Sequence, residues 1–301
     1  MKRLILFPGQ GAQYNGMAKD IYESSSEGRT VLDEIFMNVD FDLKSIMFEE
    51  DTRLNQTEYT QPALFAHSLA VLAAAGIKGD MVLGHSLGEL PALVHAGVLN
   101  IQDGIKIVAK RGELMSKSEG GGMAAVIGMD LTDLQALCDD LSTETRRVQP
   151  ANLNAPDQTV VSGDAALVEE FAAKAKEKGA RRVMPLNVSG AFHSHLMDDA
   201  KKEFSDFVSG IEFSTPVIPV IQNVSARLET DPQVIKAQLI EQITSPVRFT
   251  ECVQAAVSAG TGSAVEVGPK KVLSGLIRKI DRSVSTKNID TMEQVKEFQN
   301  E

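Results

Sequence analysis

The segment GHSLG at residues 84–88 has the composition of a turn that carries a reactive serine. It fits the pattern G-x-S-x-G, in which a sharp strand-to-helix turn projects the serine and small neighbours let the backbone bend. The pattern alone is weak, because Gly and Ser are common in ordinary turns. Here a short apolar run, Met81 to Leu83, precedes the turn and a helical pattern follows Gly88. We therefore predict that Ser86 is a nucleophile.

Backbone N–H groups close to this serine are expected to stabilise an oxyanion. At a helix N-terminus the N–H of Leu87 and the helix dipole are available for this task. A second donor is expected from a loop after the first strand, and the glycine-rich GQGAQ, residues 9–13, permits a close backbone approach. We choose Gln10 as that donor. A plain turn or a phosphate loop is the alternative, although GQGAQ lacks both the GxGxxG spacing and a Gly-Lys-Ser/Thr ending.

A serine nucleophile needs a base, and the chain has five histidines. Two of them, His67 and His95, lie in apolar helical patterns that favour a structural role, and His85 belongs to the turn itself. The other two, His193 and His195, lie in SGAFHSHLM, a loop-like stretch that could carry a side chain across to the serine. Spacing alone does not choose between them.

Other residues with reactive or charged side chains give weaker signals. Arg111 lies in a helical pattern, VAKRGELM, where a solvated surface charge is the usual state of an arginine. Cys138 and Cys252 are far apart, without His or Cys at metal-ligand spacing. We therefore expect two reduced, buried thiols, no disulfide and no metal.

The elements around these residues predict an α/β fold. Residues 3–7 form a short apolar run that ends in the glycine-rich loop, and a helical pattern follows Gly16. A second helix is expected at Leu64 to Ala75. Further strands are expected at Pro216 to Gln222 and Ser263 to Val267, both in the centre of a sheet. The polar tail after Ile280 is expected to be peripheral.

The pattern changes from Gly122 onward. Strand signals at MAAVIG, PANLN, QTVVSG and 182–186 alternate with two helical segments in the order β-α-β-β-α-β, the first helix opening at Thr132 or Asp133. This order over some seventy residues is that of the split βαβ unit. We predict a small inserted domain at residues 120–189. The larger α/β domain would then be discontinuous, at residues 1–119 and 190–301.

Composition limits the classes of function. The 43% of hydrophobic residues is typical of a globular protein with a substantial core. A net charge of −11 argues against sequence-independent nucleic-acid binding, which needs a basic face. The first apolar run, Leu4 to Phe7, stops at Pro8 and is too short for a signal peptide or a membrane span. We expect a cytoplasmic protein with neither nucleic-acid nor membrane partners.

Eight segments of the chain occur in an order that resembles one family. They are FPGQGAQ, TQPAL, GHSLGE, KRGELM, GGMAAVIG, SGAFHSHLM, SPVRF and EVGPKKVLSGL. Together they are similar to the malonyl-CoA:acyl carrier protein transacylases of bacterial fatty-acid synthesis, from about Leu4 to Ile280. The resemblance implies an α/β-hydrolase-like large domain with an inserted ferredoxin-like small domain and an active site in the cleft between them.

The resemblance also assigns the site residues. It makes Ser86 the nucleophile and His193 the base, with the backbone carbonyl of Gln242 orienting the imidazole and no third carboxylate. Arg111 matches the family's arginine, whose planar guanidinium can donate two hydrogen bonds to the free carboxylate of a malonyl group. Asn152 and Gln61 match cleft-lining positions.

The reaction implied is malonyl transfer from malonyl-CoA to the phosphopantetheine thiol of acyl carrier protein, by a ping-pong route through Ser86. Coenzyme A enters as part of the substrate, and no cofactor is expected. A hydrolase on the same residues, or an inert scaffold with the same fold, are the alternatives. Two departures from the family pattern are GELPAL, which would reshape the pocket floor, and GPKKV, whose Lys270 would attract an acidic carrier protein.

Overall fold

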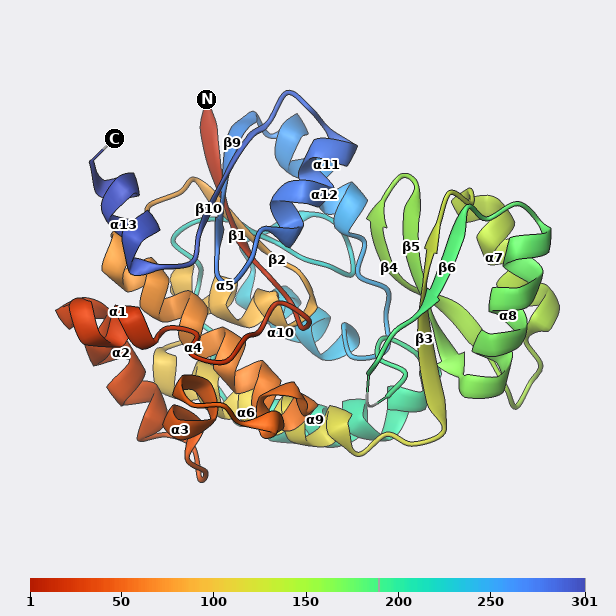
Figure 1. The fold of residues 1–301 in the computed structure, drawn as a ribbon, viewed down its shortest axis with the longest axis horizontal. Coiled ribbons are helices and arrows are strands. Elements are labelled where there is room, and N and C mark those ends of the chain that lie inside the picture. The colour runs from red at the N-terminus through yellow and green to blue at the C-terminus, as the bar shows by residue number, and fades with distance from the viewer. Residues whose placement is uncertain (189, 301) are drawn as a thin grey trace.

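A six-stranded sheet forms the centre of the protein in a computed structural model that describes residues 1–188 and 190–300 (Figure 1). Its strand order is β10-β9-β1-β2-β7-β8. Neighbouring strands are parallel except at β8, which pairs antiparallel with β7. The strands are β1 (Lys2–Phe7), β2 (Met81–Gly84), β7 (Val220–Ile221), β8 (Leu228–Glu229), β9 (Thr261–Val267) and β10 (Ser285–Ile289).

Strand β1 shows why this sheet is central. Its residues from Leu4 to Phe7 are all buried, which is typical of a strand in a parallel sheet that is covered on both faces. Leu4 and Leu6 belong to the core on one face, while Ile5 and Phe7 belong to the core on the other. The apolar residues that predict this strand therefore pack into the hydrophobic cores on both faces of the sheet.

Helices cover both faces of the central sheet (Figure 1). One face packs against α11 (Phe249–Ser258) and α12 (Val272–Ile280). The other face lies over a larger helical layer built around α4 (Thr57–Ala75) and α6 (Ile101–Ser116), the most closely packed pair of helices. The remaining helices of that layer are α1 (Lys19–Ser24), α2 (Ser26–Phe36), α3 (Leu43–Phe48), α5 (Glu89–His95), α9 (Asp198–Ser209), α10 (Pro232–Glu241) and α13 (Met292–Gln299). Short 3₁₀ turns are η1 (Thr52–Asn55), η2 (Ser86–Gly88) and η3 (His195–Met197).

A four-stranded antiparallel sheet forms a second, smaller part, with the strand order β4-β5-β3-β6. Its elements are β3 (Gly121–Ile127), α7 (Leu131–Leu141), β4 (Val148–Ala155), β5 (Gln158–Asp164), α8 (Ala165–Glu177) and β6 (Arg182–Pro185). This is the predicted ferredoxin-like arrangement. Asp130, rather than Thr132 or Asp133, caps the first helix, since its side chain accepts the N–H of Thr132.

The small sheet is apolar on both faces. Ala124 and Val126 of β3 pack with α7 and α8, whereas Met123 and Ala125 belong to the core of the larger part. The chain leaves the large part before β3 and returns to it after β6, as Figure 1 shows. The predicted end of the small domain, Ser189, and the last residue, Glu301, lie outside the described residues. The division at 120–189 stays a prediction.

Two predicted features of the large part differ from the structure. The strand expected at Pro216 to Gln222 is reduced to the two residues of β7, because Pro216 and Pro219 have no N–H to donate to a neighbouring strand. The tail after Ile280 is not merely peripheral. It supplies the edge strand β10 and helix α13, and it buries Ile289 and Val295.

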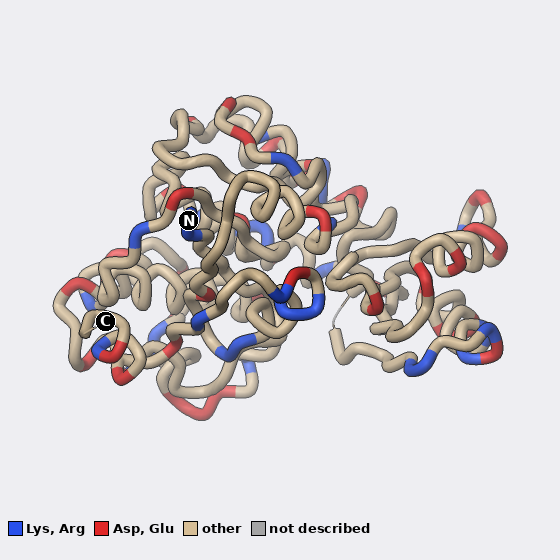
Figure 2. The backbone as a smooth tube through the Cα atoms, turned by 90° about the horizontal axis from the view of Figure 1, so that it is seen from above, with Lys and Arg blue, Asp and Glu red and all other residues tan. Residues whose placement is uncertain are grey.

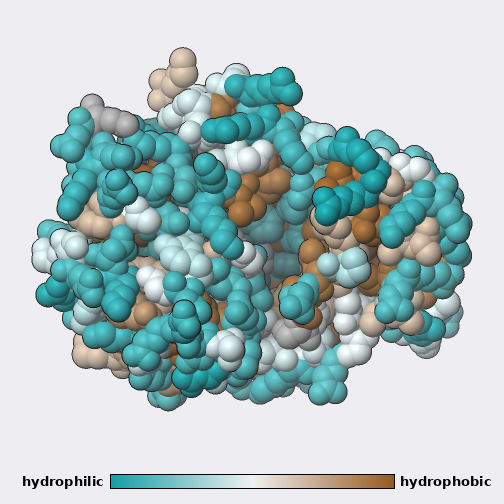
Figure 3. Space-filling view, in the orientation of Figure 1, coloured by the Kyte–Doolittle hydropathy of each residue, from teal (hydrophilic) through white to brown (hydrophobic). Residues whose placement is uncertain are grey.

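Charged residues are spread over both parts, and basic residues are interspersed with acidic ones in Figure 2. Figure 3 shows a hollow between the two parts, with hydrophobic residues on its walls. Among the described residues, no helix combines the length and the apolar composition that a membrane crossing requires.

Candidate active site

Ser86 lies on a tight turn between β2 and α5. Its φ of +53° is in the left-handed region, which is unusual for a residue with a side chain. Gly84 and Gly88 make the turn possible, because their backbones touch. A Cβ on Gly84 would lie 1.8 Å from the carbonyl carbon of Gly88, and a Cβ on Gly88 would lie 2.1 Å from the carbonyl oxygen of Phe7. The turn has the form that the G-x-S-x-G pattern predicts.

A Gly88→Ala substitution tests this account of the turn. We expect it to lower the free energy of unfolding by more than about 2 kcal/mol, because the new methyl group would meet backbone atoms that have no room to move. Gly275→Ala is the matched control, since a Cβ there meets nothing within 4 Å in the middle of α12. The control should be neutral or stabilise by up to about 1 kcal/mol. Equal chemical-denaturation midpoints for the two variants would refute the close-contact argument.

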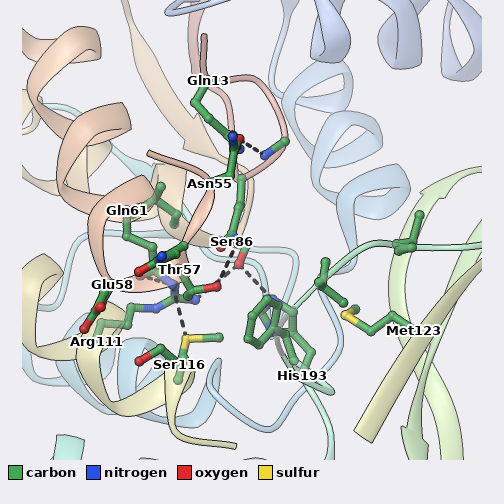
Figure 4. A pocket seen from close by; sticks show the side chains of 18 of the residues that line it. Gln13, Asn55, Thr57, Glu58, Gln61, Ser86, Arg111, Ser116, Met123 and His193 are labelled. Carbon is green, nitrogen blue, oxygen red and sulfur yellow. Dashed lines mark hydrogen bonds between the residues drawn. The ribbon is translucent and has the colours of Figure 1, made fainter. Parts of the chain in front are cut away.

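His193 is the histidine that meets the serine. Its Nε2 lies 2.7 Å from Ser86 Oγ (Figure 4). Its Nδ1 lies 2.8 Å from the backbone oxygen of Gln242. A carbonyl can only accept, so Nδ1–H donates to it and the Nε2 lone pair faces the serine hydroxyl. This tautomer can take the proton of Ser86. The backbone of His193 has a φ of +58°, and Gln149 of β4 donates from Nε2 to its carbonyl oxygen at 3.2 Å.

His195 does not reach the serine. Its Nε2 lies 3.3 Å from a carboxylate oxygen of Asp164, at the end of β5. Spacing alone left both histidines open and the family resemblance chose His193, which is the one that the structure brings to Ser86. The buried His67 lies 3.1 Å from Asp290, which agrees with the structural role expected for it.

The environment of His193 keeps its imidazole neutral. Burial, and then the positive charge of Arg111, lower the pKa of His193 to about 3. A base acts while it is neutral, so a lowered pKa extends its working range toward acid.

The rate at which malonyl-CoA acylates the protein should therefore stay within about twofold between about pH 7.5 and 5.5. A histidine with the ordinary pKa of about 6.5 would lose about tenfold over the same interval. Rapid-quench mass measurement at several pH values checks this. An acid limb centred near pH 6.5 would contradict the described environment of His193.

Arg111 is a buried residue of α6 and not the solvated surface charge that its helix alone suggested. Its side chain is 1% exposed. Nη1 donates to Gln61 Oε1 at 2.8 Å, and Nη2 donates to Gln242 Oε1 at 2.8 Å and to Ser86 Oγ at 3.2 Å. Burial lowers the pKa of Arg111 to about 10, against the opposing charge of Glu89. The guanidinium is therefore still charged at neutral pH, beside the serine hydroxyl.

The loop after β1 runs alongside the serine turn. A Cβ on Gly9 would lie 2.7 Å from the carbonyl oxygen of His85, so the two backbones nearly touch. The side chain of Gln10 is tied to α4, because its Nε2 donates to Thr57 Oγ1 at 3.0 Å. Gln10 and Leu87 both line the same cavity as Ser86. Their positions allow two N–H groups to approach one oxygen atom bound next to Ser86.

The cavity that holds these groups has a volume of about 720 Å³. It lies in the hollow between the two parts of the molecule, with residues of the β1 loop, α4, α6 and β3 around it (Figures 3 and 4). Besides Ser86 and His193 it is lined by the predicted residues Gln10, Gln61, Leu87, Arg111 and Asn152. Gln242 is fully buried and contacts Arg111 and His193. Its volume lies in the range of small-molecule binding sites.

The two departures from the family pattern lie outside this cavity. Leu90 of GELPAL is fully buried in the core of the large part, and neither it nor Pro91 occurs among the described lining residues. Neither side chain forms the surface of the pocket, and the expected reshaping of its floor stays a prediction. Lys270 of GPKKV has a φ of +62°, and its Nζ donates to the carbonyl of Gly11 at 3.2 Å. This hydrogen bond ties Lys270 to the loop that contains Gln10. The attraction of Lys270 for a carrier protein stays a prediction.

Sequence reasoning missed two residues below the site. Glu89 and Asn223 are almost fully buried and contact the groups that hold Ser86 and His193. The Glu in GHSLGE was a visible signal, whereas nothing in the segment around Asn223 pointed to the site. Both cysteines are free and buried, as expected. Within residues 1–188 and 190–300, no cluster of His, Cys, Asp and Glu could hold a metal ion.

Comparison with known proteins places this geometry in a family. The model of the family described as "Acyl transferase domain" matches residues 5–300. A malonyl CoA-acyl carrier protein transacylase from Staphylococcus aureus (strain MRSA252) is 46% identical over 300 residues, covering 98% of this chain and 97% of the relative.

Solved structures agree with the sequence relatives. An acyl carrier protein S-malonyltransferase from Vibrio cholerae superposes with a TM-score of 0.94 at 37% identity, over 99% of each chain. A malonyl-transacylase in complex with a type II PKS acyl-carrier protein superposes with a TM-score of 0.95 at 33% identity, over 100% of this chain and 99% of that one. The chain therefore belongs to the acyl transferase domain family, and within it to the malonyl CoA-acyl carrier protein transacylases.

Proposed function

We propose that this protein transfers a malonyl group from malonyl-CoA to the phosphopantetheine thiol of acyl carrier protein, through a malonyl ester on Ser86, and so supplies malonyl units for fatty-acid synthesis. One observation carries the proposal. Ser86 Oγ lies 2.7 Å from the unprotonated Nε2 of His193 and 3.2 Å from Nη2 of the buried Arg111, and it lines an open cavity. The first distance supports an acyl-enzyme route, and the second supports an acyl group with its own negative charge.

In the first half-reaction His193 Nε2 takes the hydroxyl proton while Ser86 Oγ attacks the thioester carbonyl of malonyl-CoA. The carbonyl oxygen becomes an oxyanion, which the N–H groups of Leu87 and Gln10 stabilise. Collapse of this intermediate breaks the carbon–sulfur bond, and the proton on His193 goes to the departing thiolate. Coenzyme A leaves as its thiol.

In the second half-reaction the carrier's thiol gives its proton to His193 and attacks the ester carbonyl. The serine oxygen departs and recovers the proton from Nε2. Malonyl-carrier and free enzyme result, so the two steps balance without any oxidant or reductant. We propose that the reaction needs no metal and no cofactor beyond the substrate thioester, because proton transfer and charge stabilisation are the only assistance required.

Arg111 is proposed to bind the free carboxylate of the malonyl group. A planar fork with two donors suits a carboxylate, and the pair forms in a buried environment where charge-assisted hydrogen bonds are strong. An acetyl group would leave the guanidinium without that partner. The expected consequence is a preference for dicarboxylic acyl groups.

We also propose the division of the chain at residues 120–189, with the cavity between the two parts as the place where malonyl-CoA and the carrier arm bind. The separate small sheet and the hydrophobic walls of the hollow support it. A cytoplasmic location is proposed on the family relationship alone.

Initial-rate kinetics with malonyl-CoA and holo-carrier protein test the proposed function. A two-step route through Ser86 gives parallel double-reciprocal lines, and the malonyl-carrier formed should account for the coenzyme A released. Release of malonate in place of malonyl-carrier would make the protein a hydrolase. If neither malonyl-carrier nor malonate forms, the protein is a scaffold without catalytic activity.

A further inference from the structure

A buried carboxylate that the mechanism above does not use lies directly below the serine turn. Glu89 is the first residue of α5, three positions after Ser86, and it is 1% exposed. Both of its carboxylate oxygens accept hydrogen bonds. Oε1 accepts from the backbone N–H of Asn223 at 3.1 Å, and Oε2 accepts from Nε2 of Gln242. A fully buried carboxylate is costly unless it is paired, so its retention here calls for a physical reason.

The contact with Gln242 fixes the direction of a side-chain amide. Only the nitrogen end of an amide can donate, so the carboxylate of Glu89 forces that end toward itself. The oxygen end then faces the opposite way and accepts from Arg111 Nη2 at 2.8 Å. The backbone oxygen of the same glutamine accepts from His193 Nδ1 at 2.8 Å. Glu89 therefore contacts the one residue that accepts hydrogen bonds from both Arg111 and His193.

The contact with Asn223 leads to the serine turn. Glu89 holds the backbone N–H of Asn223, and the side chain of Asn223 spans the turn. Its Oδ1 accepts from the N–H of Ser86 at 2.7 Å, and its Nδ2 donates to the carbonyl of Gly84 at 2.7 Å. These bonds hold the serine in its left-handed conformation, whose φ is +53°.

When it is ionised, Glu89 carries a charge opposite to that of Arg111. Burial raises the pKa of Glu89 to about 8, against the N–H of Asn223 and the charge of Arg111, which both favour the carboxylate. In return, the charge of Glu89 partly offsets the burial that lowers the pKa of Arg111. In its ionised form, which becomes the major form above about pH 8, Glu89 compensates the charge of the buried guanidinium.

We propose that Glu89 is a positioning residue, which holds Gln242 and Asn223 in the orientations that align Ser86, His193 and Arg111 for acyl transfer. The proposal rests on the proposed function of this site. It gives Glu89 no contact with the substrate, and assigns its effect to hydrogen bonds that lie one residue away from the reacting atoms. Misplacement of reacting groups by a fraction of an ångström to 1 Å lowers rates by up to about a hundredfold.

A second buried carboxylate provides the matched control. Glu266 of β9 is 0% exposed and likewise accepts two backbone N–H groups, from Leu273 at 2.9 Å and Ser274 at 2.8 Å. These bonds hold the start of α12, and Glu266 is not among the residues that line the cavity. Glu266→Gln therefore reports what the loss of a buried carboxylate does to stability alone.

The experiment compares the wild type, Glu89→Gln and Glu266→Gln in three measurements. These are kcat and KM with malonyl-CoA and holo-carrier, the labelling rate of Ser86 with a neutral fluorophosphonate, and the melting temperature. For Glu89→Gln we expect kcat to fall about 10- to 100-fold with KM changed less than about threefold, and labelling to slow by a similar factor. Glu266→Gln should melt lower but keep both rates within about threefold of wild type.

Gln242→Ala tests whether Glu89 acts through the side chain of Gln242. The substitution removes the side-chain amide but leaves the backbone carbonyl that His193 contacts. We expect it to lower kcat by about as much as Glu89→Gln, and the double variant to be no worse than about threefold below the poorer single variant. Additive losses, or a Glu89→Gln enzyme that merely melts lower as Glu266→Gln does, would overturn the proposal. If Glu89→Gln does not fold, Gln242→Ala decides: unchanged kcat and labelling refute a positioning role.

The labelling measurement separates this proposal from the proposed function. The fluorophosphonate needs only an aligned serine and histidine, and no malonyl or carrier group. A wild-type protein that is labelled but forms no malonyl adduct would refute the malonyl transfer and leave the role of Glu89 open to the same comparison.

Discussion

Replacing His193 by alanine should lower kcat for malonyl transfer by about 10⁴-fold. His193 Nε2 lies 2.7 Å from Ser86 Oγ, and the guanidinium of Arg111, which also contacts that oxygen, cannot act as a base. Without the imidazole, the serine hydroxyl must lose its proton to water. The acylation rate, followed by rapid-quench mass measurement with malonyl-CoA, gives the size of the loss.

His195→Ala is the control for this result, because it removes a second imidazole from the same loop. His195 contacts Asp164 rather than the serine, so its loss should change kcat by less than about threefold. Retention of more than a tenth of the activity by His193→Ala would show that another group deprotonates Ser86. Equal losses in the two variants would show a general disturbance of the loop.

Replacing Arg111 by alanine should lower kcat/KM for malonyl-CoA by about 10²- to 10³-fold, and that for acetyl-CoA by less than about tenfold. The guanidinium is buried, and its Nη2 lies beside Ser86 Oγ, where only an acyl group with its own carboxylate can pair with it. The ratio of the two kcat/KM values therefore measures the proposed pairing. It should fall even if the variant is less stable, because both substrates are tested on one enzyme.

Two further variants sharpen the comparison. Arg111→Lys keeps the positive charge but cannot form the two parallel hydrogen bonds of a guanidinium. Its preference for malonyl should therefore lie between those of the wild type and Arg111→Ala. Lys110→Ala removes a neighbouring cation of the same helix, which pairs with Glu113 near the surface, and should leave the ratio unchanged. If Arg111→Ala lowers malonyl and acetyl use equally, Arg111 does not select the acyl group.

The local features of the site were predictable because short segments fix them. GHSLG needs glycines where two backbones touch, and the apolar run before it predicts β2. The order of strands and helices likewise predicts the small ferredoxin-like part. A signal for the burial of Arg111 was also present, because Gly104, Val108, Arg111 and Met115 share one buried face of α6. Periodicity could have assigned Arg111 to the interior without any family resemblance.

Other features depend on contacts between distant segments. His193 and His195 are two residues apart, in an irregular segment and at the start of η3, and the one that faces Ser86 has a left-handed backbone conformation. No local pattern encodes that conformation for a histidine. The same holds for Asn223, which reaches the serine turn across more than a hundred residues of sequence.

The errors in the large part have physical causes as well. Residues 216–222 are rich in β-branched side chains, but Pro219 cannot donate a ladder hydrogen bond, so only Val220 and Ile221 pair. Strand β10 escaped notice for the opposite reason. It lies at the edge of the sheet and is half exposed, so its polar sequence STKNI carries little hydrophobic signal.

The central claim, a malonyl ester on Ser86 that is passed to a carrier protein, is tested most directly by intact mass spectrometry. The purified protein is mixed with malonyl-CoA, freed of excess reagent, and chased with buffer or with phosphopantetheinylated carrier protein. We expect one malonyl adduct that is absent from Ser86→Ala, persists in buffer and moves to the carrier. An adduct that is lost equally fast in buffer, or one that still forms on Ser86→Ala, would contradict the account.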